Sequence, residues 1–569
     1  MFPAIAPLAS PILLFLFSAN SNRSLPHFRR PLFIMSTVDA IVVGAGFGGI
    51  YNLYKLKALG LSVKCFEKAP EVGGTWYWSQ YPGATSDSSS EVYRFSFDKD
   101  LLKTYPWSTH FLPQQESQAY LKHLVERYDL DQHIQLSTEL KGASFDVATS
   151  SWTVNFSNGE SYRTTYLVLA CGSFHTPNWP KIPGLDKFAG PVYHTGDWPE
   201  KRDLSGKRVG VIGTGSSGAQ VLVNIADEVK HLVSFQRSAQ HVVPHPNGPV
   251  SDEYREWINN NYDNVWEQVN KHPVGHPLIH NTTPAMSVSA KEREQIWEEL
   301  WNHGTNGFSF MYGPFGDIHS SAEANRELCK FFEKKIAQSI TDPDKRKKLI
   351  PSEIYGKRPV TLSGYYETFN KKHVDIVNYE HTPFVTINEQ GILTEEKQWG
   401  LDVIILATGY EVMDGSYNKL ELQGTHGTLK DSWTKAGLPT SYLGVSETGF
   451  PNMFFVVGPQ SPFANMPPLI ECQGNFIAGL IERAEAQKRE NGGKIVLIEA
   501  KEKAKQAWIE KCQTLAERSL FRSVKSYIYG NTAPGKDSPG IMWLGGYGYY
   551  RNTIKEVSEN QYPGFSFSA

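Results

Sequence analysis

Two glycine-rich segments have the spacing that holds the diphosphate of a dinucleotide cofactor. Both follow the pattern GxGxxG, whose glycines allow a tight turn, close approach of the backbone to phosphate, and close packing of a helix on the preceding strand. The phosphates then lie at the helix N-terminus, where free N–H groups and the helix dipole favour anions. The first triplet is Gly44, Gly46 and Gly49, and the second is Gly213, Gly215 and Gly218. Ser216 and Ser217, which lie within the second motif, are expected to be further cofactor contacts.

The two segments differ in the charge that ends the following strand. Residues 38–68 predict strand, glycine turn, helix and a second strand ending in Glu67; residues 206–238 repeat this order but end in Arg237 and Ser238. A carboxylate accepts hydrogen bonds from a ribose with a free 2′-hydroxyl, whereas an arginine suits a 2′-phosphate. We therefore expect FAD at the first turn and NADPH at the second. The alternative for Arg237 is an ordinary solvated charge at a strand end.

These elements predict an α/β fold with two Rossmann-like dinucleotide-binding domains, one for FAD and one for NADPH. Two further apolar strands, at residues 166–172 and 402–410, end in glycine-containing turns, as expected where a chain passes between domains. Charged, helix-forming stretches after residue 245 predict a helical insertion in the NADPH domain. The expected parts are a leader (1–35), an FAD-binding domain (36–170 and 408–569), an NADPH-binding domain (171–244 and 351–407) and a helical subdomain (245–350).

The composition is typical of a globular protein and has no nucleic-acid signature. The 569 residues are 40% hydrophobic and 20% charged, with a formal net charge of -3 at pH 7, so no basic surface for nucleic acid is expected. The cysteines include no CxxC pair. We therefore expect reduced thiols, a cytoplasmic location and no metal site, and a flavoprotein of the disulfide-reductase type is excluded.

The first 34 residues contain an apolar stretch, SPILLFLFSAN, that could be taken for a targeting signal. The stretch is shorter than the roughly 20 residues that cross a bilayer. The first basic residue, Arg23, follows the stretch instead of preceding it, unlike the order in a signal peptide. We expect a disordered leader and no stable membrane insertion.

The segment FAGPVYHTGDWP, between the two glycine motifs, carries the pattern FxGxxxHxxxWP. It resembles the fingerprint of type I Baeyer–Villiger monooxygenases, which are FAD- and NADPH-dependent flavoproteins, and the resemblance extends over essentially the whole chain after Met35. It implies that His194 acts in a linker that couples cofactor binding to domain movement. Taken alone, His194 would be interpreted as a loop histidine bonded to backbone. The matching residues are Phe188, Gly190, His194, Trp198 and Pro199.

Other segments resemble the active site of the same family. GGTWYWSQYPGATSDSSS is similar to its flavin-cradling segment and places Asp87 at its active-site aspartate. GKRPVTLSGYYETFN places Arg358 at its catalytic arginine, and Lys357 at a contact to the NADPH phosphate. GNTAPGK (530–536) also matches. The cofactor contacts that these segments imply are Thr75, Trp76, Asp87, Tyr93, Lys357 and Arg358. The chain departs from the family pattern at Gln80, Ser86, Cys171 and Tyr527.

The resemblance implies insertion of one oxygen atom of O2 beside a ketone carbonyl, giving an ester or lactone through a C4a-peroxyflavin, with NADPH as reductant. Arg358 would stabilise the anion, because arginine stays charged and presents a planar fork of donors, and Asp87 would hold that fork in place. The alternative is an ordinary salt bridge between two residues that are 271 positions apart. The resemblance places residues 458–471 in the loop that lines the substrate pocket of the family. Its apolar side chains indicate a small to medium apolar ketone as substrate, unless these side chains only pack in the protein interior. Its apolar residues are Phe463, Met466 and Leu469.

Two rival functions share these motifs. A flavin monooxygenase that oxidises nitrogen or sulfur would keep both glycine turns but would not need Arg358. A non-catalytic flavoprotein would bind FAD and NADP(H) without turnover, and the presence of Lys357, Arg358 and Asp87 argues against it. Consumption of NADPH that depends on a ketone and yields an ester separates the first rival from a Baeyer–Villiger enzyme.

Overall fold

The computed structural model describes residues 35–245, 247–278, 280–303, 306–412, 415–529 and 540–569. The predicted leader, apart from Met35, and the matching segment 530–536 lie outside the described residues. The described residues form an α/β fold with two separate large sheets, so the predicted fold class is confirmed. In this part of the chain, no helix has both the length and the hydrophobicity needed to cross a bilayer.

The first sheet is built around the strand that precedes the first glycine turn. β1 (Ser36–Val43) lies between β2 (Val63–Phe66) and β8 (Ser161–Leu169), which both run parallel to it, and α1 (Phe47–Ala58) connects β1 to β2. The order is β19, β6, β7, β8, β1, β2, β5, and β20 also pairs with β8. The sheet therefore takes strands from both halves of the chain. Its other strands are β5 (Ile134–Gln135), β6 (Leu140–Asp146), β7 (Ser151–Phe156), β19 (Glu421–Gln423) and β20 (Met453–Phe455).

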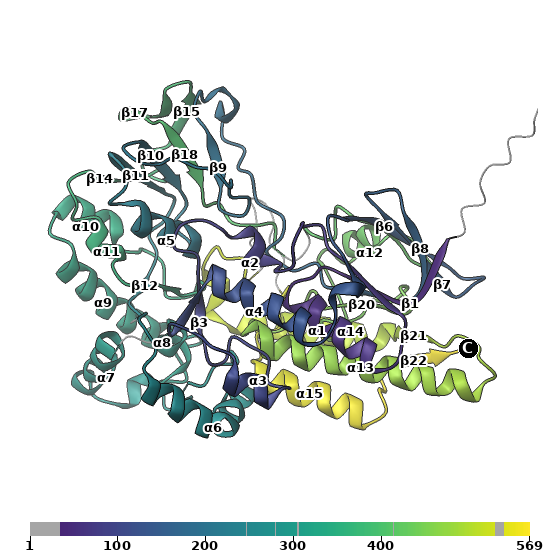
Figure 1. Cartoon of the computed structure of the whole chain (residues 1–569). Helices are drawn as coiled ribbons and strands as arrows, with labels where there is room; N and C mark the ends of the chain where they lie inside the picture. Colours follow the sequence, from purple (N-terminus) through teal and green to yellow (C-terminus); the bar gives the residue numbers. More distant parts are fainter. Residues whose placement is uncertain (1–34, 246, 279, 304–305, 413–414, 530–539) are drawn as a thin grey trace, which may run out of the picture.

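The second sheet surrounds the second glycine turn and is parallel throughout. Its order is β14, β11, β10, β18, β9, and α5 (Ser216–Ile225) follows β10. β9 comes from the FxGxxxHxxxWP segment, so His194 is the last residue of an edge strand. Figure 1 shows this sheet at the upper left and the first sheet at the right. The strands of the second sheet are β9 (Val192–His194), β10 (Arg208–Ile212), β11 (His231–Gln236), β14 (Val374–Asn378) and β18 (Val403–Leu406).

In the described residues, five α-helices lie between β12 and β13 in the chain. Four of them begin at a residue whose side chain accepts a hydrogen bond from the first helical turn, namely Ser251, Ser289, Ser321 and Asp342. Such caps satisfy N–H groups that would otherwise have no partner. Buried rings such as Phe310 and Phe331 join the helices into one core. The elements are α6 (Asp252–Lys271), α7 (Ala290–His303), α8 (Phe308–Tyr312), α9 (Ala322–Ser339), α10 (Pro343–Leu349), β12 (Val242–Val243) and β13 (Val360–Thr361).

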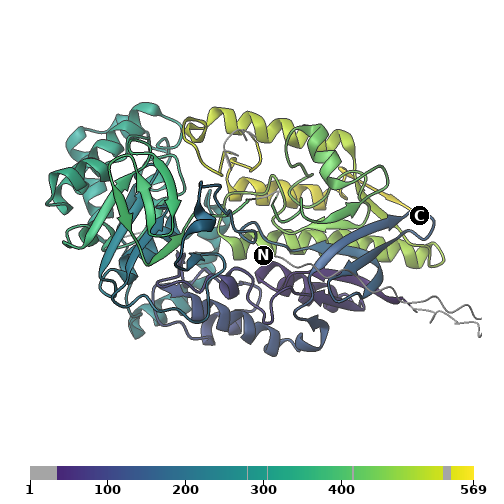
Figure 2. The same ribbon diagram turned by 90° about the horizontal axis from the view of Figure 1, so that it is seen from above.

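The C-terminal helices lie mainly in the half of the molecule that holds the first sheet (Figure 2). α13 (Met466–Glu490) contacts α1, and α14 (Glu502–Arg518) contributes a buried ion pair. In that pair, Lys505 Nζ lies 2.6 Å from Glu447 Oε1, and the two side chains are 9% and 0% exposed. Because loss of one partner would leave a buried unpaired charge, the pair fixes α14 in place.

The remaining elements are short or peripheral. They are α2 (Thr75–Trp78), α3 (Lys99–Thr104), α4 (Gln114–Arg127), α11 (Tyr365–Thr368), α12 (Leu429–Ala436), α15 (Tyr547–Glu559), β3 (Thr85–Ser89), β4 (Phe111–Pro113), β15 (Phe384–Asn388), β16 (Gly391–Thr394), β17 (Gln398–Gly400), β21 (Leu497–Ala500) and β22 (Phe565–Ser568).

Candidate active site

The two glycine turns have the same backbone geometry. A Cβ on Gly49 would lie 1.6 Å from the Gly44 carbonyl oxygen, and a Cβ on Gly218 would lie 2.1 Å from that of Gly213. Only glycine therefore lets each helix begin so close to its strand. Within the described residues, α1 and α5 have neither a side-chain cap nor an acidic residue in the first turn. Their terminal N–H groups thus remain available to an anion, which fits the diphosphate of a dinucleotide.

Glu67 lies where the sequence predicts it, directly after β2, and it lines the same cavity as the first glycine turn. Its Oε2 accepts a hydrogen bond from the Ala45 N–H at 2.6 Å, and its Oε1 accepts one from the Ala69 N–H at 2.8 Å. Burial raises the pKa of Glu67, and these backbone donors oppose that shift. A carboxylate offers about four lone-pair sites, so Glu67 retains the capacity to accept a ribose hydroxyl.

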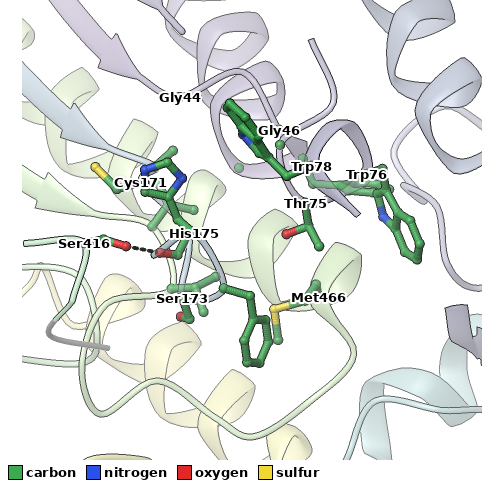
Figure 3. A pocket seen from close by; sticks show the side chains of 18 of the residues that line it. Gly44, Gly46, Thr75, Trp76, Trp78, Cys171, Ser173, His175, Ser416 and Met466 are labelled. Atoms are coloured by element: carbon green, nitrogen blue, oxygen red, sulfur yellow. Dashed lines mark hydrogen bonds between the residues drawn. The ribbon is translucent and has the colours of Figure 1, made fainter. Parts of the chain in front are cut away.

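A cavity of about 640 Å³ extends from the first glycine turn to Asp87 and Arg358. This volume lies within the range of small-molecule and cofactor sites. In Figure 3, Gly44 and Gly46 lie across the cavity from the chain that carries Cys171 and His175, and the Ser416 hydroxyl donates to the Gly172 carbonyl at 2.9 Å. The predicted flavin contacts Thr75, Trp76, Asp87 and Tyr93 all line this cavity.

Arg358 and Asp87 meet in the cavity wall although they are far apart in the sequence. Arg358 Nη2 donates to both Asp87 carboxylate oxygens, at 2.7 Å each. The Arg358 side chain is 31% exposed and the Asp87 side chain 15%, and both line the cavity. Burial by itself would lower the pKa of Arg358, but Asp87 and the Tyr527 hydroxyl outweigh that effect and raise it. The guanidinium therefore stays charged at every working pH.

Two buried polar atoms beside this pair fit a bound ligand. The Tyr527 hydroxyl lies close to the Arg358 guanidinium, but in the part of the chain that the structure describes neither this hydroxyl nor Arg358 Nε forms a hydrogen bond of good geometry. Buried donors of this kind are normally satisfied, because an unpaired one costs free energy. Both residues line the cavity, so a cofactor or substrate there has access to a charged donor and a hydroxyl.

Apolar side chains line part of the cavity that also holds the charged pair. Of the three predicted pocket residues, Phe463 and Met466 line the cavity, whereas Leu469 is fully buried in the core that includes β1 and α1. The sequence analysis missed the other members of this wall. They come from three distant segments of the chain, so no local pattern marks them. They are His276, Phe308 and Met542.

The second glycine turn lies beside the predicted 2′-phosphate contacts. Arg237 and Ser238 directly follow β11, and Arg237 is exposed. Lys357 Nζ donates to the Ser238 hydroxyl at 3.0 Å and forms an ion pair with Glu353. The Thr214 hydroxyl donates to the Ser238 carbonyl at 3.3 Å. The fold thus brings the three predicted residues to one edge of the second sheet.

His194 lies outside the described cavity lining and ties together the two chain segments that connect the sheets. These segments run antiparallel, with the Asn178 N–H donating to Gly409 and the Glu411 N–H to Thr176, both at 2.9 Å. His194 Nδ1 accepts from the Gly196 N–H at 2.9 Å, and its Nε2 lies 3.3 Å from the Thr408 hydroxyl.

The same network sets the protonation of His194. The Thr408 hydroxyl donates to the Asn178 carbonyl at 2.6 Å, so it accepts from the imidazole. The proton therefore lies on Nε2. Burial lowers the pKa of His194 to about 4, so the ring is neutral at pH 7.

Of the four residues that depart from the family pattern, Ser86, Cys171 and Tyr527 line the cavity. None of the four provides a reactive thiolate. Burial raises the pKa of the Cys171 thiol to about 12, so the thiol stays protonated. The Ser86 hydroxyl donates to the Ser88 carbonyl at 3.2 Å. Tyr527 lies beside Arg358 as described above. Gln80 is exposed and its amide donates to the Tyr77 carbonyl at 2.7 Å.

Comparison with known proteins gives consistent matches. Residues 38–247 match the family model described as flavin-binding monooxygenase-like. The chain is 43% identical over 530 residues to a phenazine N-monooxygenase from Lysobacter antibioticus, covering 93% of this chain and 96% of that protein. It is 41% identical over 527 residues to a Baeyer–Villiger monooxygenase from Pseudooceanicola batsensis, covering 92% and 95%. The crystal structure of cyclohexanone monooxygenase from Rhodococcus sp. Phi1 bound to NADP+ matches with a TM-score of 0.90 and 43% identity, covering 94% and 100%.

Proposed function

This chain belongs to the flavin-binding monooxygenase-like family, and from that premise we propose that it is a Baeyer–Villiger monooxygenase. It inserts one oxygen atom of O2 into a ketone to give an ester or lactone, with FAD and NADPH as cofactors. The observation that carries the proposal is the Arg358–Asp87 pair, which faces an apolar part of the cavity. The apolar wall around Phe308 and Phe463 favours a small to medium apolar ketone.

The first glycine turn, Glu67 and the segment around Thr75 and Trp76 would hold FAD. Trp76 Nε1 donates to the Tyr93 hydroxyl at 3.0 Å, which fixes the indole in the wall of the cavity. When bound, FAD reduced by NADPH supplies the activation of O2, which no side chain can supply by itself.

Arg358 would stabilise the negative charge that develops on oxygen during the reaction. Its guanidinium is fixed by Asp87 before any ligand binds, so no reorganisation is needed when the charge appears. Its unpaired Nε–H remains free to donate. The apolar wall keeps water away from the reacting atoms, which strengthens the interaction of the guanidinium with that charge.

Arg237, Ser238 and Lys357 would hold the 2′-phosphate of NADPH, beside the turn of Gly213, Gly215, Ser216, Ser217 and Gly218. We assign FAD to the unit formed by 36–170 and 408–569, and NADPH to the unit formed by 171–244 and 351–407. Residues 245–350 form the helical subdomain. We also propose a cytoplasmic location, because all five cysteines are free thiols, as a reducing compartment favours.

We propose His194 as a positioning residue between the two cofactor units. His194→Ala removes the hydrogen bond to Thr408 of one connecting segment and the local bond from the Gly196 N–H, a loss of about 1–3 kcal/mol. Reduction of the flavin by NADPH should slow about tenfold while FAD content is retained, as measured by stopped-flow absorbance. His231→Ala, on the same sheet but paired with Asp375 at the surface, is the matched control and should reduce at the wild-type rate. Purification of His194→Ala without FAD would make His194 a folding or flavin-site residue.

A second candidate function is oxygenation of an aromatic nitrogen. The similarity to a phenazine N-monooxygenase supports it. The two functions make different demands on Arg358, because oxygen transfer to nitrogen uses a neutral oxidant and needs no fixed cation.

Product analysis distinguishes the two functions. The holoenzyme is supplied with NADPH and ¹⁸O2 and with linear, cyclic and aryl ketones, or with phenazine, and products are identified by mass. We expect one ¹⁸O atom in an ester or lactone. Label found only in an N-oxide, with no ester from any ketone, would contradict the main proposal.

A further inference from the structure

The apolar part of the cavity contains a buried histidine. His276 is 2% exposed and lines the cavity together with Asp87 and Arg358. Its ring stacks on Phe308 with centroids 5.5 Å apart and 27° between the planes, and Phe308 meets Phe463 edge-on at 5.6 Å. Within the described ranges of the chain, Asp87 and Arg358 act on His276 through their charges, and neither contributes a hydrogen bond to its ring.

The imidazole of His276 is neutral. Burial lowers its pKa to about 4, and the nearby Arg358 adds to this effect while Asp87 opposes it. A neutral imidazole has one N–H donor and one acceptor nitrogen. A hydrogen-bonding group of a ligand in the cavity can therefore pair with this imidazole, and such pairing is favourable in a buried site.

We propose that His276 selects ketones that carry a second, uncharged hydrogen-bonding group, such as a hydroxyl, on an otherwise apolar body. This inference rests on the proposed function and narrows its substrate class. The stack on Phe308 holds the plane of the imidazole, so the direction of its hydrogen bonds is set before the ligand arrives. Phe308 and Phe463 cover the hydrocarbon of the ketone. A ligand that lacks the second polar group leaves the imidazole unpaired and binds less well.

The test compares hydroxyl- and methyl-substituted ketones of nearly equal size. Dissociation constants of 3- and 4-hydroxycyclohexanone and of 3- and 4-methylcyclohexanone are measured by calorimetry on the FAD-loaded enzyme without NADPH. The quantity of interest is the ratio of Kd for the methyl compound to Kd for the hydroxyl compound. In His276→Phe, which keeps an aromatic ring on Phe308, this ratio should fall about three- to tenfold at one or both ring positions, as expected for one neutral hydrogen bond.

A histidine in the same loop provides the matched control. His272 is also buried, but its Nδ1 accepts from the Val274 N–H at 3.3 Å, and it lies outside the described cavity lining. The ratio in His272→Phe should equal that of the wild type. His276→Gln, which keeps a donor and an acceptor, should retain part of the wild-type ratio.

An unchanged ratio at both positions in His276→Phe, with normal FAD content, overturns the inference. If that variant loses FAD, the same comparison with His276→Leu decides. Ester formation is measured separately with NADPH. If neither ketone yields an ester, the proposed function fails, whereas the binding ratio still tests the role of His276 independently.

Discussion

Replacing Arg358 with alanine is expected to lower the rate of ester formation about 100- to 1,000-fold while FAD stays bound. Loss of one fixed donor that stabilises a developing negative charge typically has an effect of this size. The flavin's diphosphate contacts lie at the Gly44–Gly49 turn, which the substitution does not touch. NADPH oxidation that remains should produce hydrogen peroxide instead of ester. The measurements are ester yield by gas chromatography, peroxide by a coupled assay and FAD by absorbance.

The chain offers a matched control for Arg358. Arg208 also pairs with an aspartate, Asp402, with Nη2 at 2.6 Å from Oδ1, but this pair is at the surface, with side chains 44% and 36% exposed. Arg208→Ala should therefore leave ester formation unchanged. Arg358→Lys should restore little activity, because a point charge on a flexible stem does not reproduce the planar fork held by Asp87. Ester formation by Arg358→Ala at a rate near that of the wild type would mean that the Arg358–Asp87 pair is only a salt bridge.

Arg237→Ala is expected to raise the KM for NADPH about 10- to 100-fold and to change the KM for NADH very little. A hydrogen bond to a charged group contributes about 1.5–3 kcal/mol, and each 1.36 kcal/mol corresponds to tenfold. The exposed position of Arg237 next to the Ser238–Lys357 contact leaves its guanidinium free to reach a 2′-phosphate. Steady-state oxidation of both nucleotides with the same ketone measures the two constants.

A cation at the other end of the same strand serves as the control for Arg237. Lys230 is exposed and directly precedes β11, so Lys230→Ala removes the same charge from the sheet without touching its carboxyl edge. It should leave both constants unchanged. Equal increases in KM for NADPH and NADH in Arg237→Ala would show that Arg237 does not read the 2′-phosphate.

The local parts of this protein could be predicted from the sequence. Both glycine turns, the strands and helices around them, and the positions of Glu67 and Arg237 at strand ends follow from spacing alone. The physical reason is that turn geometry and the strand and helix periods act over a few residues, so each unit carries its own pattern. The predicted α/β fold class holds for the same reason.

The arrangement of the site was decided only by the tertiary structure. Arg358 and Asp87 meet because two segments 271 positions apart close on one cavity, and no local period marks such a contact. The orientation of α13 places Met466 in the cavity and Leu469 in the core. Both side chains are apolar, so the sequence alone does not predict which of them lines the cavity. His276 lines the cavity because the chain after α6 folds back onto Phe308. Contacts between distant segments depend on how whole layers pack, so the sequence determines the cofactor units and the packing determines the cavity between them.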